Sequence, residues 1–367
     1  MKGRFHVRLE PRLSSPRWLA VGVPVLSVLF ALLVGAVFLL ATGHHPASTY
    51  LRILDNGFIS YYGITDTLGL ATPLICTGLA AAFAFRMNLF NIGEEGQMYL
   101  GMLAAAWTGI VVVDGWPAPL AVTTVLVAGA GGGAAWVVVP AALRARLGTS
   151  EIVSSLLLNY VALNLVNFFI FGSRTVLRAN SPFPEGRQIS PAARLDGFGS
   201  TNTYPTVLVA VVLAIGLWWF MRRSNFGYET SVMADSPNAA RYAGMSASKL
   251  TVLVLVGSGA LAGVGGAMYV VGPAGKVDPG LLQIGLGYAG IVVAALARYN
   301  FAAVVLTALL FSGLRTGGAA LQVSSDPVPI AIAVVIQGAV LLFALGGEMF
   351  RRHRLVIRRT VRDGVMA

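Results

Sequence analysis

The chain has little charge for its length. Only 11% of its 367 residues are Asp, Glu, Lys or Arg, whereas 56% are hydrophobic, and the mean hydropathy is +0.75. Soluble globular domains carry about a quarter charged residues, so the composition excludes that class. It predicts an all-α, polytopic membrane protein, and the 43 glycines agree with helices that contact each other closely in lipid.

The residues of disulfides, metal centres and nucleotide sites are also scarce. The single cysteine, Cys76, lies in an apolar run and excludes an intrachain disulfide or a cysteine-based metal site. The four histidines lie outside the apolar segments, so no catalytic metal is expected. Gly275-Lys276 matches the Gly-Lys pair of a P-loop, but the rest of that motif is missing. Val270 stands at the position of the first glycine, and Val277 stands at the position of the Ser or Thr. We expect no enzymatic activity and no cofactor in this chain.

Long apolar runs are abundant. A helix needs about 20 apolar residues to cross roughly 30 Å of hydrocarbon, and ten segments approach that length. Their approximate limits are 18–42, 67–85, 98–113, 118–142, 152–171, 205–221, 250–272, 281–297, 300–314 and 328–346. The sequence therefore predicts about ten spans within a transmembrane domain at 18–346.

The basic residues predict the orientation. Lys and Arg concentrate in the N-terminal segment 1–17, the polar loop 222–249 and the tail 347–367, which ten spans place on one side. The positive-inside rule makes that side, with both termini, cytoplasmic. The loop 172–204 is then external. Although it carries four arginines, its length and prolines indicate an ordered lid or docking loop.

Two polar stretches stand close to or within the spans. In Phe90-Asn91-Ile92-Gly93-Glu94-Glu95-Gly96-Gln97, Asn91 can cap a helix with Glu94 at its third position, and the helix can begin inside the protein. In 152–171, Tyr160, Asn164 and Asn167 share one helical face, which we expect to turn inward. Hydrogen bonds between helices and the lining of an aqueous path remain alternative roles.

Another feature is a short capped segment in the loop 222–249. Ser236 suits an N-cap, Pro237 the first helical position, and Gly244 the turn that ends a helix of about two turns. So short a helix needs something to pack against, which favours a docking element. An ordinary loop helix is the alternative. Elsewhere, Gly259, Gly263 and Ala267 form a row of small side chains that predicts a close helix contact.

Three motifs together resemble one family, over roughly residues 65–345. FNIGEEGQ at 90–97 resembles the Asn-Ile/Leu-Gly-x-Glu-Gly-Gln signature of permease subunits of ABC importers for nucleosides and simple sugars. These are related to the ribose and branched-chain amino acid permeases. SSLLLNY at 154–160 and SPNAARYAGM at 236–245 resemble the family's next two motifs. Glu94 and Ser150 depart from the pattern, where a small or apolar residue and an Asn are usual.

The resemblance implies a pathway subunit without chemistry of its own, in the cytoplasmic (inner) membrane of a prokaryote. The implied partners are a second homologous permease, ATP-binding subunits that bind ATP and Mg, and an external substrate-binding lipoprotein. The implied ATPase-coupling residues are Ser236, Pro237, Asn238, Ala239, Ala240, Arg241, Tyr242 and Gly244.

Nucleoside uptake by alternating access is the leading hypothesis, because amide side chains can match hydroxyls and ring nitrogens as donors and acceptors. The expected path residues are Asn88, Asn91, Glu95, Gln97, Asn159, Asn164 and Asn167. Uptake of ribose or galactose, or of branched-chain amino acids, is the alternative within the family. A stand-alone secondary transporter, which the lack of mid-span acids disfavours, and a structural scaffold belong to other classes.

Overall fold

The computed structural model describes residues 5–11, 17–172, 175–183, 185–199, 201, 203–277, 280, 285–323 and 327–359. The chain divides into two compact units. One joins the two ends of the chain, Met1–Arg52 and Leu321–Ala367, and the other comprises Ile53–Ala320. Both units are predominantly helical, which confirms the predicted fold class in outline.

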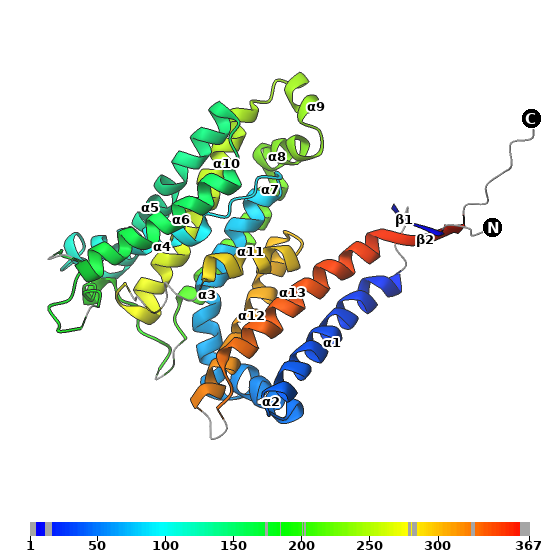
Figure 1. The fold of residues 1–367 in the computed structure, drawn as a ribbon. Helices are drawn as coiled ribbons and strands as arrows, with labels where there is room; N and C mark the ends of the chain where they lie inside the picture. Colours follow the sequence, from blue (N-terminus) through cyan, green and yellow to red (C-terminus); the bar gives the residue numbers. More distant parts are fainter. Residues whose placement is uncertain are drawn as a thin grey trace, which may run out of the picture. The chain divides into compact units, whose positions relative to one another are not determined.

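The unit made from the chain ends contains a helix pair and a small sheet. Its elements are β1 (Phe5–Pro11), α1 (Arg17–Ala41), α2 (Pro46–Leu54, which ends just inside the other unit), η6 (Leu321–Val323), α13 (Ile330–Arg352) and β2 (His353–Arg359). Helices α1 and α13 lie side by side, and Ser27 Oγ donates to the carbonyl of Phe343 at 2.8 Å (Figure 1). The strands pair antiparallel from Phe5 with Arg359 to Pro11 with His353. This sheet was not predicted from the sequence.

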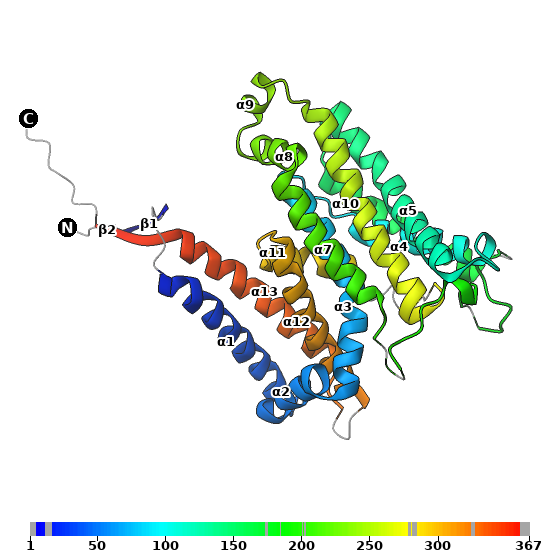
Figure 2. The ribbon, with the colours of Figure 1, turned by 180° about the vertical axis from the view of Figure 1, so that it is seen from behind.

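The second unit is a helical bundle. Its elements are η1 (Asp55–Ile59), α3 (Tyr61–Phe85), α4 (Glu94–Val111), α5 (Ala118–Leu147), α6 (Glu151–Asn167), η2 (Phe168–Gly172), η3 (Pro191–Ala193), α7 (Thr206–Arg223), α8 (Asn225–Asp235), α9 (Pro237–Tyr242), α10 (Ala247–Tyr269), η4 (Val270–Ala274), α11 (Leu286–Leu296) and α12 (Phe301–Ala320). Helix α3 forms the core, because every residue from Ala71 to Phe85 is buried. Helices α8 and α9 lie together at one end of this unit, beyond the ends of α7 and α10 (Figures 1 and 2).

Small residues set the contact between α10 and its neighbours. Helix α10 packs on α3, α4 and α5 (Figure 2). A Cβ built at Gly259 would lie 2.7 Å from the carbonyl oxygen of Gly133, and one at Gly263 would lie 3.0 Å from the Cα of Gly133. Larger side chains would force these backbones apart. The predicted close contact along Gly259, Gly263 and Ala267 is confirmed, and α5 is one partner.

The number of spans differs from the prediction. Within the described residues, six helices are long and apolar enough to cross a membrane, or seven if the bent pair Val25–Ala41 and Pro46–Ile59 counts as one span. The prediction of ten is therefore wrong for this part of the chain. Helix α4 opens on two carboxylates, and α11 has 11 residues, which reach only about 16 Å. Residues 281–284 of one predicted span and several side chains of 328–346 lie outside the described set.

Candidate functional site

The irregular stretch before α4 and the first turn of that helix are buried inside the second unit. Asn91, Glu94, Glu95 and Gln97 have exposed fractions between 0 and 3%. The Asn91 and Gln97 amides bond to each other twice, with Nδ2 donating to Oε1 at 2.8 Å and Nε2 to Oδ1 at 2.9 Å. Asn91 Nδ2 also donates to Ser258 Oγ of α10 at 2.9 Å. The paired amides thereby fix the helix start to α10.

The helix cap that the sequence predicts at Asn91, with Glu94 at the third helical position, is not formed. Helix α4 does begin inside the protein, at Glu94, but its N-cap residue is Gly93, which has no side chain to cap with. Asn91 Oδ1 instead accepts from the backbone N–H of Gly93 at 3.0 Å. The prediction was wrong because local spacing does not reveal that Gln97 and Ser258 engage the same amide.

A row of polar side chains on α6 holds the irregular stretch from the other side. Ser155 Oγ accepts from the N–H of Ile92 at 3.2 Å. Asn159 donates to the carbonyl of Ile92 at 2.7 Å and accepts from the N–H of Gly96 at 2.9 Å. Because residues 90–93 are not helical and the N–H groups in the first turn of α4 lack intrahelical acceptors, these side chains replace the missing backbone partners.

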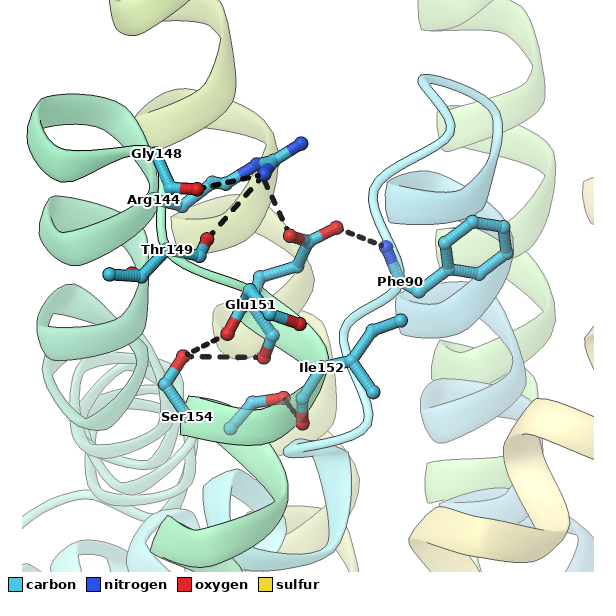
Figure 3. A network of polar contacts seen from close by, with 9 residues as sticks. Phe90, Arg144, Gly148, Thr149, Glu151, Ile152 and Ser154 are labelled. Carbon is cyan, nitrogen blue, oxygen red and sulfur yellow. Dashed lines mark hydrogen bonds and ion pairs between the residues drawn. The ribbon is translucent and has the colours of Figure 1, made fainter.

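Glu151 begins the same row and joins three segments. Its carboxylate accepts from the N–H of Phe90 at 3.2 Å and forms an ion pair with Arg144 Nε at 3.2 Å. Figure 3 shows the carboxylate between Arg144, at the end of α5, and Phe90, in the stretch before α4. The start of α6 is therefore tied to α5 and to the start of α4.

Glu95 connects α4 to the start of α11. Its Oε2 accepts from the N–H of Gly287 at 2.5 Å and from the N–H of Tyr288 at 3.3 Å, and its Oε1 accepts from the Tyr99 hydroxyl. The N-terminal amides of a helix favour a carboxylate, because they lack intrahelical acceptors and carry the positive end of the dipole. Arg315 of α12 adds a cation whose charge acts on Glu95.

Glu94, the neighbouring acid, is in a different situation. It is 0% exposed, and neither carboxylate oxygen has a hydrogen-bond partner among the residues that the structure describes. A buried carboxylate without a partner is unfavourable, so its charged form is strongly disfavoured there. Glu94 is also one of the two positions where the sequence departs from the motifs that it resembles.

The structure brings together only some of the predicted path residues. Asn91, Glu95, Gln97 and Asn159 belong to the buried network described above. Asn88 does not, since it is exposed and donates to the carbonyl of Ala234, the penultimate residue of α8, at 3.1 Å. Asn88 therefore lies apart from the buried network of Asn91, and its role in the path stays a prediction.

The predicted inward face of α6 is also different. Tyr160 is 62% exposed, and Asn164 is exposed with its Nδ2 donating to the Tyr160 carbonyl at 2.8 Å, while Asn167 is half-buried. The buried face of α6 carries Glu151, Ser155, Asn159, Ala162 and Val166. The four-residue spacing of Glu151, Ser155 and Asn159 was the feature of the sequence that could have indicated this buried face. Sequence reasoning also missed the contributions of Tyr99, Ser258 and Tyr288, which come from distant parts of the chain.

The short capped helix is present as α9. Ser236 Oγ accepts from the N–H of Ala239 at 3.4 Å, Pro237 is the first residue, and Gly244 has a φ of +80°, which glycine adopts without strain. Ala240 is fully buried, whereas the other residues of α9 are exposed and Tyr242 is 95% exposed. Helix α8, which precedes α9 in the same loop, was not expected.

Comparisons with known proteins identify the family of the chain. Residues 63–345 match the family described as branched-chain amino acid transport system / permease component. The chain is 34% identical to the glucose ABC transporter permease protein TsgB13 of Haloferax volcanii, over 96% of this chain and 94% of that one. It is 32% identical to the guanosine ABC transporter permease protein NupP of Bacillus subtilis, over 90% and 94%. It is 31% identical to the nucleoside ABC transporter permease protein NupB of Lactococcus lactis, over 88% and 89%. The chain is therefore a multi-pass membrane protein of this family, an ABC transporter permease subunit.

Proposed function

We propose that this permease subunit imports nucleosides by alternating access, powered by separate ATPase subunits. The observation that carries the ATPase-driven mechanism is α9, a capped helix with one buried residue and an exposed remainder, which leaves a surface free for another protein. Two relatives above 30% identity are named as guanosine and nucleoside permeases, which supports the substrate class. A prokaryotic cytoplasmic membrane is the proposed location.

A simple sugar is the second candidate substrate. The relative with 34% identity is named as a glucose permease, and it is covered almost completely by this chain. A nucleoside keeps all the hydroxyls of its ribose except the anomeric one, which the base replaces, and simple sugars are rich in hydroxyls too, so a path lined with amides suits both classes.

The proposed partners follow from the exposed surface of α9 and from the relatives of the chain. ATP and Mg would be bound by the ATPase subunits that contact α9. A second homologous permease would complete the path, and four of the relatives form two pairs by name, NupP with NupQ and TsgB13 with TsgC13.

An external binding protein would dock on the loop 172–204. Arg178, Arg187 and Lys276 line an open cavity of about 470 Å³ there. The Lys276 ammonium donates to Glu185 at 2.5 Å and holds the pKa of that carboxyl below its usual range. Because Glu185 offsets only one of the three positive charges, the cavity has an excess of positive charge and suits an acidic partner.

We further propose two roles for the predicted path residues. Asn164 and Asn167, on the less buried side of α6, would line the path shared with the second permease. Asn91, Glu95, Gln97 and Asn159 would hold α4, α6, α10 and α11 together, so that these helices move as one body. A network with its polar groups bonded to one another is suited to that positioning role.

Asn164→Leu should preserve folding and change transport. Its amide bonds only to a carbonyl of its own helix among the contacts described, so the substitution should change stability by less than about 1 kcal/mol. If Asn164 lines the path, the KM or kcat for nucleoside uptake should change severalfold. Val161→Leu, at another exposed position of α6, is the matched control. Unchanged kinetics would remove Asn164 from the path.

The substrate class is tested by uptake into proteoliposomes that contain the assembled complex. We expect ATP-dependent accumulation of labelled guanosine, with unlabelled nucleosides competing and glucose not competing. Competition by glucose alone would favour the sugar alternative. Uptake by this chain without ATPase subunits, driven by a proton gradient, would contradict the proposed mechanism.

A further inference from the structure

An open cavity of about 490 Å³ lies where four elements of the second unit end or begin. It is formed by the last residue of α3, the end of α7, the end of α8 and the turn before α12. Its lining residues are Phe85, Arg86, Asn88, Trp218, Arg222, Ala234, Asp235, Arg298, Tyr299 and Asn300. None of these residues belongs to the buried network of α4.

The cavity is strongly cationic. Three guanidinium groups, from Arg86, Arg222 and Arg298, line it together with a single carboxylate, that of Asp235. Burial and, second, the neighbouring Arg222 charge lower the pKa of Arg86. The two guanidiniums therefore lie close enough to repel each other, and an anion between them would relieve that repulsion.

Aromatic rings hold two of these guanidiniums in place. The Arg86 Cζ lies 5.2 Å from the centroid of the Phe301 ring, and the Arg222 Cζ lies 4.7 Å from that of Trp218. Such cation–π contacts restrict long side chains before a ligand arrives. Planar guanidiniums fixed in this way suit phosphate oxygens, which they can bind through paired N–H donors.

The backbone around the cavity is unusual as well. Among the described residues, the non-glycine residues with positive φ are Asn88, Arg298 and Tyr299, at +56°, +52° and +59°, and all three line this cavity. The left-handed conformation is strained for most residues other than glycine, although Asn tolerates it better than Arg or Tyr. Strain of this kind collects at ligand-binding segments, where the surrounding structure enforces it.

The position of the cavity indicates where such an anion comes from. Helix α7 is long and apolar enough to span a membrane, and its last turns carry Trp219 and Phe220, which are exposed, before Arg222 and Arg223. Exposed aromatic and basic residues at the end of a span mark the membrane–water interface. Basic pockets between helices at this level are suited to lipid headgroups.

We propose that this cavity is a binding site for a phosphate group, carried either by an anionic phospholipid or by a soluble phosphate ester. The bound phosphate bridges Arg86, Arg222 and Arg298. Because Ala234 and Asp235 also line the cavity and directly precede Ser236, occupancy fixes the junction between α8 and α9. The proposal concerns binding alone and does not depend on what the protein transports.

The test compares two charge-neutralising variants of the full-length chain purified from membranes. The double variant Arg222→Gln/Arg298→Gln removes two lining guanidiniums but keeps Arg86, whose stacking on Phe301 contributes to the core. Arg223→Gln is the control, because Arg223 is exposed on the same helix and does not line the cavity. Native mass spectrometry after reconstitution in phosphatidylcholine with or without phosphatidylglycerol measures the lipid arm. Calorimetric titration with inorganic phosphate and adenosine monophosphate measures the soluble arm.

We expect the wild-type chain to retain phosphatidylglycerol, a soluble phosphate, or both. The double variant should bind at least about tenfold more weakly, since each charge-assisted hydrogen bond is stronger than a neutral one. Arg223→Gln should bind like the wild type. The proposal is wrong if the wild-type chain binds none of these probes, or if the double variant and the control lose binding equally.

Discussion

Tyr242→Ala should abolish ATP-driven uptake while the protein still folds and inserts normally. Tyr242 ends α9 and is 95% exposed, so its ring makes little contact within this chain. Exposed aromatic residues that become buried at an interface often contribute about 2–4 kcal/mol to binding. A loss of that size weakens the ATPase contact by about 30- to 1000-fold. Uptake in proteoliposomes and co-purification of the ATPase subunits measure the effect.

A matched control separates docking from a general loss of aromatic surface. Tyr62 is 71% exposed at the start of α3, whereas the end of α3 faces the cavity beside α8. Tyr62→Ala should therefore leave uptake and ATPase recovery unchanged. If Tyr242→Ala transports at the wild-type rate, α9 is not the surface that receives the ATPase.

Burial decides which alanine of α9 or its C-cap can be replaced with Trp to test docking. Ala243 is exposed, so Ala243→Trp should block docking sterically without disturbing the fold. Ala240 is fully buried, and a Trp there would instead destabilise the packing of α9, by about 1–3 kcal/mol or more. Ala240→Trp should thus lower the melting temperature, a result that Ala243→Trp should not share.

Glu95→Leu should severely destabilise the protein, whereas Glu94→Leu should not. Without the Glu95 carboxylate, the backbone N–H groups of Gly287 and Tyr288 lose this acceptor, and the Tyr99 hydroxyl loses its hydrogen bond to Glu95. Each unsatisfied buried donor costs about 1–3 kcal/mol, and the sum approaches the whole stability of a typical domain. Fluorescence-detected size exclusion should show little monodisperse protein.

Glu94 is the internal comparison, because it carries the same side chain one position earlier. Its buried carboxylate has no partner among the described residues, so replacing it with Leu removes an unfavourable burial. Glu94→Leu should melt at or above the wild-type temperature. A collapse equal to that of Glu95→Leu would show that Glu94 has a structural partner. Glu95→Gln, which keeps one acceptor oxygen, should fall between the two Leu variants.

The face of α6 shows the limit of local inference. Two rows of polar residues in α6 have the spacing of a helical face. One row is Tyr160, Asn164 and Asn167, and the other is Glu151, Ser155 and Asn159. Only the contacts with Ile92, Gly96 and Phe90 decide between them, and these residues lie about 60 positions earlier in the chain. Periodicity identifies a face, whereas the neighbouring element determines which face is buried.

The sequence alone determined the features that depend on neighbouring residues. The helical membrane class follows from composition, α9 follows from Ser236, Pro237 and Gly244, and the close contact of α10 follows from its row of small residues. Caps, turns and small-residue rows act over a few positions, so they can be deduced before folding is known.

Only the tertiary structure decided which distant groups meet. It paired β1 with β2, which lie at opposite ends of the sequence, and it placed Asn88 next to α8 and away from Asn91. It also gave the adjacent Glu94 and Glu95 different surroundings. It also brought three arginines from α7, from the end of α3 and from the turn before α12 around one cavity. The physical reason is that burial and hydrogen bonding depend on what packs against a residue, and packing joins segments that share no local pattern.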